Sequence, residues 1–126
     1  MNKEMTTPYT MELTGLELST PEDAAAAITA IDCTKPGVAI MKDKAVFHNI
    51  KVSNMDVRAA NILKQTFLSK GGEVAVSGHC ADFSAKTTDV IIMATLHQYK
   101  LAIPVLLIQP WGLKKLAVQL KAYLEL

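Results

Sequence analysis

Three polar side chains share one flank of a helix that the sequence predicts near the middle of the chain. Lys64 and Gln65 follow Asn61 by three and four residues, the spacing that places side chains on one side of a helix. Amide and ammonium groups donate hydrogen bonds to polar ligands or partners. Open α/β sheets bind ligands at a sheet edge, so Thr88 and Asp89, just before a buried strand, are the natural companions of this flank. The alternative is a solvated helix face, which every amphipathic helix must have.

His79 and Cys80 form a second group of side chains that are able to do chemistry. Adjacent residues of an extended segment point to opposite sides, which is a poor arrangement for binding one metal ion. No third residue is placed to orient the histidine for thiol catalysis, and free cysteines are usually small core residues. His48 and His97 are distant in sequence and suit a half-buried strand position and a helix surface. We therefore expect no catalytic residue, no metal site and no cofactor; a thiol-dependent or metal-dependent protein centred on His79 and Cys80 is the third hypothesis.

Composition narrows the class of protein. The chain has 126 residues, of which 50% are hydrophobic and 20% charged, as in one ordinary globular domain. Its net charge is +1 and its basic residues are scattered, so we expect no nucleic-acid partner. Residues 1–10 lack the apolar core of a signal peptide, and the longest apolar run is too short and too interrupted to span a bilayer. These features predict a cytoplasmic protein with reduced thiols and no membrane partner.

Hydrophobic periodicity and turn residues predict the elements. In the first half we expect a polar tail over 1–9, a strand over 9–18, a helix beginning at Pro21 with Thr20 as its cap, a turn at 35–37, and one or two strands within 38–52. In the second half we expect a helix capped by Ser53 and ended by Gly71, then a strand over 73–78, a loop over 79–88 and a buried strand over 89–95. A helix capped by Thr95 and Gln98 follows, which Pro104 ends or kinks, and a last helix starts at Pro110. Residues 103–108 fit either a helix or a strand.

These elements predict an α/β fold. About twenty residues separate the strand before Ser53 from the strand at 73–78, which favours a crossover between two parallel strands. We expect a single compact domain over 1–126, with a mixed sheet of four to five strands covered by three to four helices.

Three segments of the chain resemble a known family. The runs ANILKQTFLSKGGEVAVSG, TTDVIIMATLHQYK and QPWGLKKLA, in this order, are similar to the N-terminal extension of clostridial-type dihydropteroate synthases. The resemblance covers residues 36–124. The family's catalytic part is a TIM barrel of about 250 residues, and its Asn-Thr-Pro-Asp-Ser-Phe motif has no match in this sequence. The chain also departs from the family at Gly78-His79-Cys80 and at Pro104.

The resemblance implies a non-catalytic accessory or binding module that acts in or near folate and one-carbon metabolism. It implies a barrel protein of the dihydropteroate synthase type as a partner; a homo-oligomer and a small molecule remain alternatives. The rival hypothesis is a small-ligand-binding protein or enzyme with a polar cleft around Asn61, Lys64, Gln65 and Asp89. We expect no catalysis by this chain alone.

Overall fold

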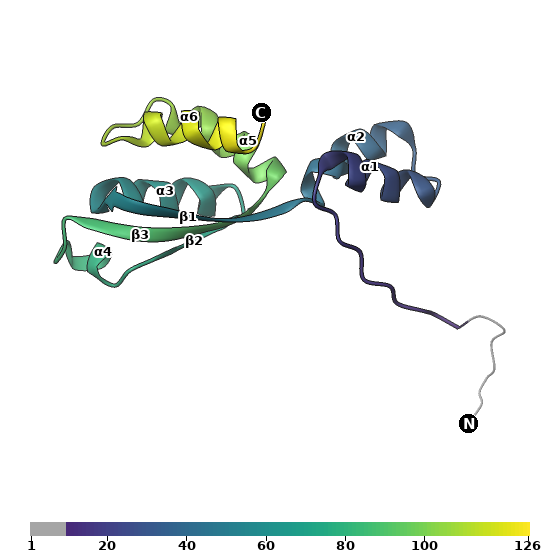
Figure 1. Ribbon diagram of the computed structural model, residues 1–126, viewed down its shortest axis with the longest axis horizontal. Coiled ribbons are helices and arrows are strands. Elements are labelled where there is room, and N and C mark those ends of the chain that lie inside the picture. The colour runs from purple at the N-terminus through teal and green to yellow at the C-terminus, as the bar shows by residue number, and fades with distance from the viewer. Residues whose placement is uncertain (1–9) are drawn as a thin grey trace, which may run out of the picture.

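A three-stranded sheet with helices on one side forms the body of the protein (Figure 1). The computed structural model describes residues 10–126; the predicted polar tail and Tyr9 lie outside them. In chain order the elements are α1 (Pro21–Ala30), α2 (Lys35–Met41), the 3-10 turn η1 (Lys42–Lys44), β1 (Phe47–Asp56), α3 (Val57–Ser69), β2 (Glu73–Val76), α4 (His79–Asp82), β3 (Thr87–Thr95), α5 (Leu96–Leu106) and α6 (Leu113–Tyr123). The predicted α/β class is confirmed.

The sheet has the order β1-β3-β2, and both neighbouring pairs are antiparallel. β1 and β2 therefore run in the same direction, as the crossover through α3 predicts, but β3 lies between them. The expected mixed sheet of four to five strands is thus wrong in two respects: residues 10–126 form three strands, and the two strands that run in the same direction are not adjacent. The register of β1 against β3 shifts between Val52 and Met55, where Asn54 has a φ of +60°.

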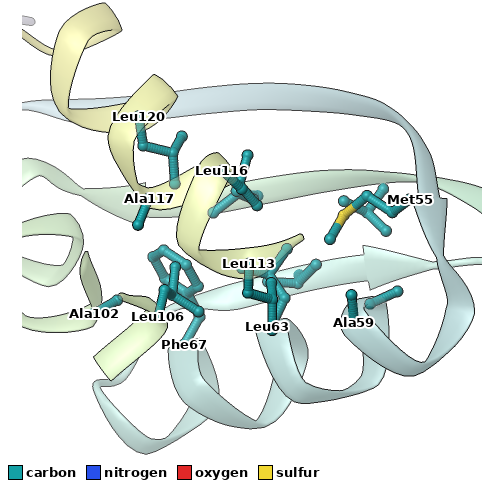
Figure 2. Packing of buried hydrophobic residues seen from close by; sticks show 14 of the residues in the cluster. Met55, Ala59, Leu63, Phe67, Ala102, Leu106, Leu113, Leu116, Ala117 and Leu120 are labelled. Carbon is teal, nitrogen blue, oxygen red and sulfur yellow. The ribbon is translucent and has the colours of Figure 1, made fainter. Parts of the chain in front are cut away.

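The hydrophobic core lies between the sheet and helices α3, α5 and α6 (Figure 2). Leu63 and Phe67 of α3 and Leu113 and Leu120 of α6 belong to this one buried cluster. The buried ring of Tyr99 packs edge-on against Phe67, and its hydroxyl donates to the His48 carbonyl oxygen at 3.0 Å. Burial raises the pKa of this hydroxyl. The buried Tyr99 hydroxyl therefore has a hydrogen-bond partner inside a largely apolar layer.

Burial alternates along the strands. In β3 the side chains of Val90 and Ile92 face the helices, whereas Asp89 and Ile91 are exposed on the other face of the sheet. The strand predicted at 89–95 is confirmed, but it is buried on one face only, because the other face of the sheet is open.

Several predicted helix boundaries are confirmed. The Thr20 hydroxyl accepts the Asp23 amide at 3.0 Å at the start of α1. Thr95 and Gln98 exchange the two hydrogen bonds of a capping box. Gly71 adopts a φ of +89° just after α3, and the next amide, that of Gly72, donates to the Phe67 carbonyl at 2.9 Å.

Four expectations for the chain up to the start of α3 are wrong. Residues 10–18 are extended but pair with no strand of the described part of the chain, so alternation alone did not make a strand. Residues 35–37 begin α2 instead of a turn, because the Thr34 hydroxyl accepts the Gly37 amide and Pro36 suits the first helical turn. The run at 38–41 is consequently helical. Asp56, not Ser53, caps α3, because the bulge at Asn54 carries β1 on to residue 56.

The second half differs in smaller ways. His79–Asp82 form the short helix α4 within the predicted loop. Pro104 lies inside α5, which continues to Leu106 because Ile103 and Leu106 are buried in the core; residues 103–106 are therefore helical and 107–108 form a turn. The last helix begins at Leu113, after a turn in which Trp111 and Gly112 both have positive φ.

Candidate functional site

The side-chain amide of Asn61 makes hydrogen bonds to the protein's own backbone. Its Nδ2 donates to the Val57 carbonyl at 3.1 Å and to the Cys80 carbonyl at 3.0 Å. The second bond connects α3 to the short helix α4, nineteen residues further along the chain. This side chain therefore fastens the segment before β3 to the helix layer.

Lys64 and Gln65 lie on the same flank but in different surroundings. The Lys64 ammonium donates to a Glu73 carboxylate oxygen and to the Val74 carbonyl, both at 2.9 Å, and so connects α3 to β2. Its hydrogen bond holds the pKa of the Glu73 carboxyl below its ordinary value. Gln65 is exposed.

Thr88 and Asp89 face opposite sides of β3. Thr88 is buried, and its hydroxyl donates to the Asp89 carbonyl at 3.1 Å. The Asp89 carboxylate lies on the open face, where it accepts the Asn54 amide at 3.1 Å and approaches the Lys51 ammonium at 3.8 Å. Asp89 therefore holds the β1 bulge in place.

The five predicted site residues are consequently divided between two surfaces. Asn61, Lys64 and Gln65 belong to the helix layer beside β2, and Asp89 belongs to the open face of the sheet. The structure does not bring them together around one cleft. A binding role for either group stays a prediction.

His79 and Cys80 are separated as the sequence suggested. Cys80 is 2% exposed and part of the core, whereas the His79 ring contacts the Ser84 hydroxyl at 2.7 Å on the surface. Within residues 10–126, no cluster of three or more His, Cys, Asp or Glu residues is arranged to hold a metal ion.

A cluster that the sequence did not single out lies where β1 ends and α3 begins. Arg58 donates from its guanidinium to both oxygens of Asp56, at 3.0 and 2.6 Å, and lies over the Trp111 ring at 4.6 Å from the ring centre. The Arg58 hydrogen bonds lower the pKa of the Asp56 carboxyl to about 2. Asp56 is thus a fixed carboxylate, and Arg58 a fixed cation stacked on an aromatic ring.

Residues with unusual backbone conformation also lie here. Asn54, Phe83 and Trp111 have φ between +56° and +60°, a region that residues with side chains seldom adopt; two further non-glycine residues of the described chain with positive φ, Asp32 and Glu125, lie elsewhere. Phe83 and Trp111 are 57% and 45% exposed. Strained backbone and exposed aromatic side chains both gather at functional sites. We refer to Asn54, Asp56, Arg58, Phe83 and Trp111 as the Asp56 end.

Two hollows flank the Asp56 end. One, of about 410 Å³, is lined by Arg58, Phe83 and Lys86, and the other, of about 160 Å³, by Asn54 and Trp111; Asp56 borders both. Both β1 and β2 have their carboxyl ends on this side of the sheet, whereas the central strand β3 has its amino end there. In the sequence, Trp111 and Gly112 follow Pro110, where the last helix is predicted to start.

A further hollow, of about 370 Å³, lies between α1, η1 and the carboxyl-terminal residues. Asp43 and Lys100 form an ion pair of 2.7 Å at its wall, and His48 also lines it. The second oxygen of Asp43 is buried and has no hydrogen-bond partner within the described residues. A donor on a small polar molecule would satisfy that oxygen.

Comparison with known proteins relates the chain to dihydropteroate synthase-type proteins of the folate pathway. The probable bifunctional folylpolyglutamate synthase/dihydropteroate synthase of Halobacterium salinarum is 34% identical over 118 residues, which are 94% of this chain and 14% of that protein. The protein of the same description from Haloferax volcanii is 33% identical over 69 residues, 55% of this chain and 8% of the relative. The bifunctional dihydropteroate synthase/dihydropteroate reductase of Helicobacter pylori is 32% identical over 85 residues, 68% of this chain and 22% of the relative.

This chain therefore spans less than a quarter of the length of each of these relatives. No protein-family model matches the chain, and no solved structure matches it. In the part of the chain that the structure describes, no helix is both long and apolar enough to cross a membrane.

Proposed function

We propose that these 126 residues are a non-catalytic accessory module that works beside a dihydropteroate synthase-type enzyme in folate metabolism. The observation that carries the proposal is the alignment with bifunctional folate enzymes: 94% of this chain matches a segment that makes up only 14% of the Halobacterium salinarum protein. A segment of that size is a module within a larger enzyme.

The fold supports a role other than the synthase chemistry itself. The resemblance places the catalytic machinery of the family in an eight-stranded barrel of about 250 residues. The sheet described here has three strands and is covered by helices on one face. The match leaves 78% or more of the length of each relative outside the aligned segment.

The Asp56 end is the surface through which we propose that the module meets its enzyme partner. Exposed aromatic residues and arginine are enriched in protein interfaces, and Trp111, Phe83 and Arg58 provide both at one place. Arg58 is already held by Asp56, so little conformational entropy is lost when a partner binds it.

Activity measurements with defined mixtures test this function. The condensation of pterin pyrophosphate with p-aminobenzoate is measured for the chain alone, for a barrel-only dihydropteroate synthase from the same genome, and for the two together. We expect no turnover by the chain alone and a change in kcat or KM of the barrel enzyme when the chain is added. Turnover by the chain alone, or a barrel enzyme that neither binds the chain nor responds to it, would refute the proposal.

The hollow at Asp43 favours a second candidate, binding of a small polar molecule, because its buried carboxylate oxygen has no partner within residues 10–126. A thermal-shift screen with pterins and folates tests it, since a ligand that binds the folded state raises the apparent melting temperature. Asp43→Asn is expected to remove any shift that depends on this hollow. A shift that survives the substitution excludes the hollow as the binding site.

A further inference from the structure

The outer edge of β1 is open and lies beside an apolar groove. β1 pairs with β3 on one side only, so alternate residues along its other edge present backbone amides and carbonyls without a strand partner in the described chain. A groove of about 510 Å³ runs along residues 49–53 of this edge, with Leu116, Leu120 and Tyr123 of α6 as its other wall. An exposed strand edge beside a helix is the arrangement that accepts an added extended segment.

The protein carries a matching extended segment. Residues 10–18 leave the body beside α1 and run away from the sheet, in a direction unlike that of β1 (Figure 1). We call residues 10–16 the arm. Its apolar side chains contact little of their own chain: Met11 is 93% exposed, Leu13 96% and Leu16 66%. Three exposed large apolar residues on one short segment indicate a surface that is covered by, or inserted into, something else.

One antiparallel register matches the arm to the β1 edge at every position. In this register the opposite residues are Thr10 and Ser53, Met11 and Val52, Glu12 and Lys51, Leu13 and Ile50, Thr14 and Asn49, Gly15 and His48, and Leu16 and Phe47. Met11 and Leu13 then join the half-buried Val52 and Ile50 on the groove side. A shift by one residue would place these apolar side chains opposite polar ones.

In this register, the side chains of the arm and of β1 that lie on the open face of the sheet also complement each other. Glu12 meets Lys51, whose side chain is 64% exposed and only 3.8 Å from Asp89, so a second carboxylate can reach it. Leu16 meets Phe47, which is itself 55% exposed. Gly15 leaves room beside the half-buried His48 ring.

We propose that the arm of a second copy of this chain adds to the outer edge of β1 as a fourth, antiparallel strand, and that two copies exchange arms. The second copy, not the same chain, is the donor, because the arm runs away from its own β1 and would have to reverse its direction next to Leu18, which packs against the cluster of Val46 and Leu96. Reciprocal exchange is a common route to symmetric dimers.

Cross-linking identifies the donor of the arm. In a background with Cys33→Ser and Cys80→Ala, whose fold is checked by circular dichroism, Glu12→Cys and Lys51→Cys are prepared separately, mixed, refolded together and treated with a short bis-maleimide. We expect a covalent dimer from the mixture. The chain that carries both substitutions is expected to give the same dimer. A cross-linked monomer from that chain, or no cross-link in either sample, overturns the proposal.

The matched control for the cross-link is Asp23→Cys mixed with Lys51→Cys. Asp23 is also an exposed acidic residue near the amino terminus, but it lies on α1 outside the arm. The proposed geometry gives no covalent dimer from this mixture. Equal dimer from both mixtures means random collision and overturns the proposal.

Sedimentation equilibrium measures how much the arm contributes to the stability of the dimer. Leu13→Asp places a charge in the groove and is expected to raise the dimer dissociation constant at least tenfold. Ile31→Asp, at an 80% exposed apolar residue after α1, is expected to leave it unchanged. Glu12→Lys should weaken the dimer, and adding Lys51→Glu should restore it. A monomeric wild type, or equal effects of Leu13→Asp and Ile31→Asp, contradicts arm exchange.

Discussion

The Arg58 guanidinium holds both oxygens of the Asp56 carboxylate, at 3.0 and 2.6 Å, while the Arg58 amide donates to the same carboxylate at 2.8 Å. Asp56 is therefore at once the cap of α3 and one half of an ion pair. Because the guanidinium lies 4.6 Å from the Trp111 ring centre, this cap also sets the position of the exposed indole. A local helix-capping interaction thus organises the proposed contact surface.

The first prediction is a pH dependence that belongs to Asp56. Hydrogen bonds from Arg58 lower the pKa of this carboxyl from 3.8 to about 2 in the folded protein. A pKa that is lower in the folded state stabilises the fold above the unfolded value, and this contribution disappears as the pH falls through about 2. We expect Asp56→Asn to lower the urea midpoint at about pH 6, and we expect the difference from wild type to shrink as the pH falls from about 4 to about 2.

A carbon NMR titration of the Asp56 carboxyl checks the cause directly. Asp23→Asn is the matched control, because Asp23 is an exposed carboxylate in the first turn of another helix. A titration midpoint for Asp56 near its ordinary value would show that the Arg58 pair does not persist in solution. If Asp23→Asn reproduces the pH-dependent loss of stability seen with Asp56→Asn, that loss does not come from the Arg58 pair.

The second prediction concerns the end of α3. Gly71→Val is expected to destabilise the fold by roughly 1–3 kcal/mol, because valine is strained at a φ of +89°. A side chain there would also meet the Gln98 amide at 3.1 Å, and Gln98 caps α5. Thermal or urea unfolding measures the effect. Gly78→Val is the control, since a side chain at Gly78 meets nothing within 4 Å, and its φ is −56°.

The third prediction separates two neighbours on the α3 flank. Lys64→Ala is expected to cost about 1 kcal/mol of unfolding free energy, because the Val74 carbonyl and the Glu73 carboxylate both lose a donor. Gln65→Ala is expected to change it by less than about 0.5 kcal/mol, because Gln65 is exposed and alanine favours a helix. Urea unfolding of both variants is the measurement. Equal effects would mean that the hydrogen bonds of Lys64 contribute nothing.

Local patterns predicted the elements whose signals are contained in a few neighbouring residues. Thr20 caps α1, Thr95 and Gln98 form the capping box of α5, and Gly71 ends α3. The apolar stripe of α3 also faces the core as its period requires. These features depend on backbone hydrogen bonds within one turn, so the sequence alone defines them.

Features set by distant partners were not predicted. Residues 10–18 alternate like a strand, yet a strand forms only where a neighbouring edge is available to pair with it. Pro104 stays inside α5 because the burial of Ile103 and Leu106 outweighs one lost hydrogen bond. The order β1-β3-β2 places β3 between two strands that precede it in the chain, and no local pattern encodes that insertion.

The Asp56 end was not predicted either, because its residues also come together from distant parts of the chain. Arg58 and Trp111 are 53 positions apart and meet only because α6 packs back over the start of α3. The side chains that drew attention in the sequence, Asn61 and Lys64, instead donate to backbone carbonyls of other elements. A polar residue at regular helical spacing does not reveal whether its partner is a ligand or the protein's own backbone.

The last prediction tests the Asp56 end without unfolding the protein. Trp111 has a φ of +58° and is 45% exposed, so Trp111→Gly relieves backbone strain while it removes a half-buried ring. These effects oppose each other, and we expect the unfolding free energy to stay within about 1 kcal/mol of wild type. If Trp111 contacts the enzyme partner, the same variant should bind a barrel-only dihydropteroate synthase at least tenfold more weakly, because exposed tryptophans at interfaces contribute about 2 kcal/mol or more.

Asp32→Gly is the control, since Asp32 has a φ of +63° on the other side of the fold, after α1. It should gain stability slightly and bind the partner as wild type does; a Trp111→Gly variant that also binds normally would exclude the Asp56 end as the contact surface.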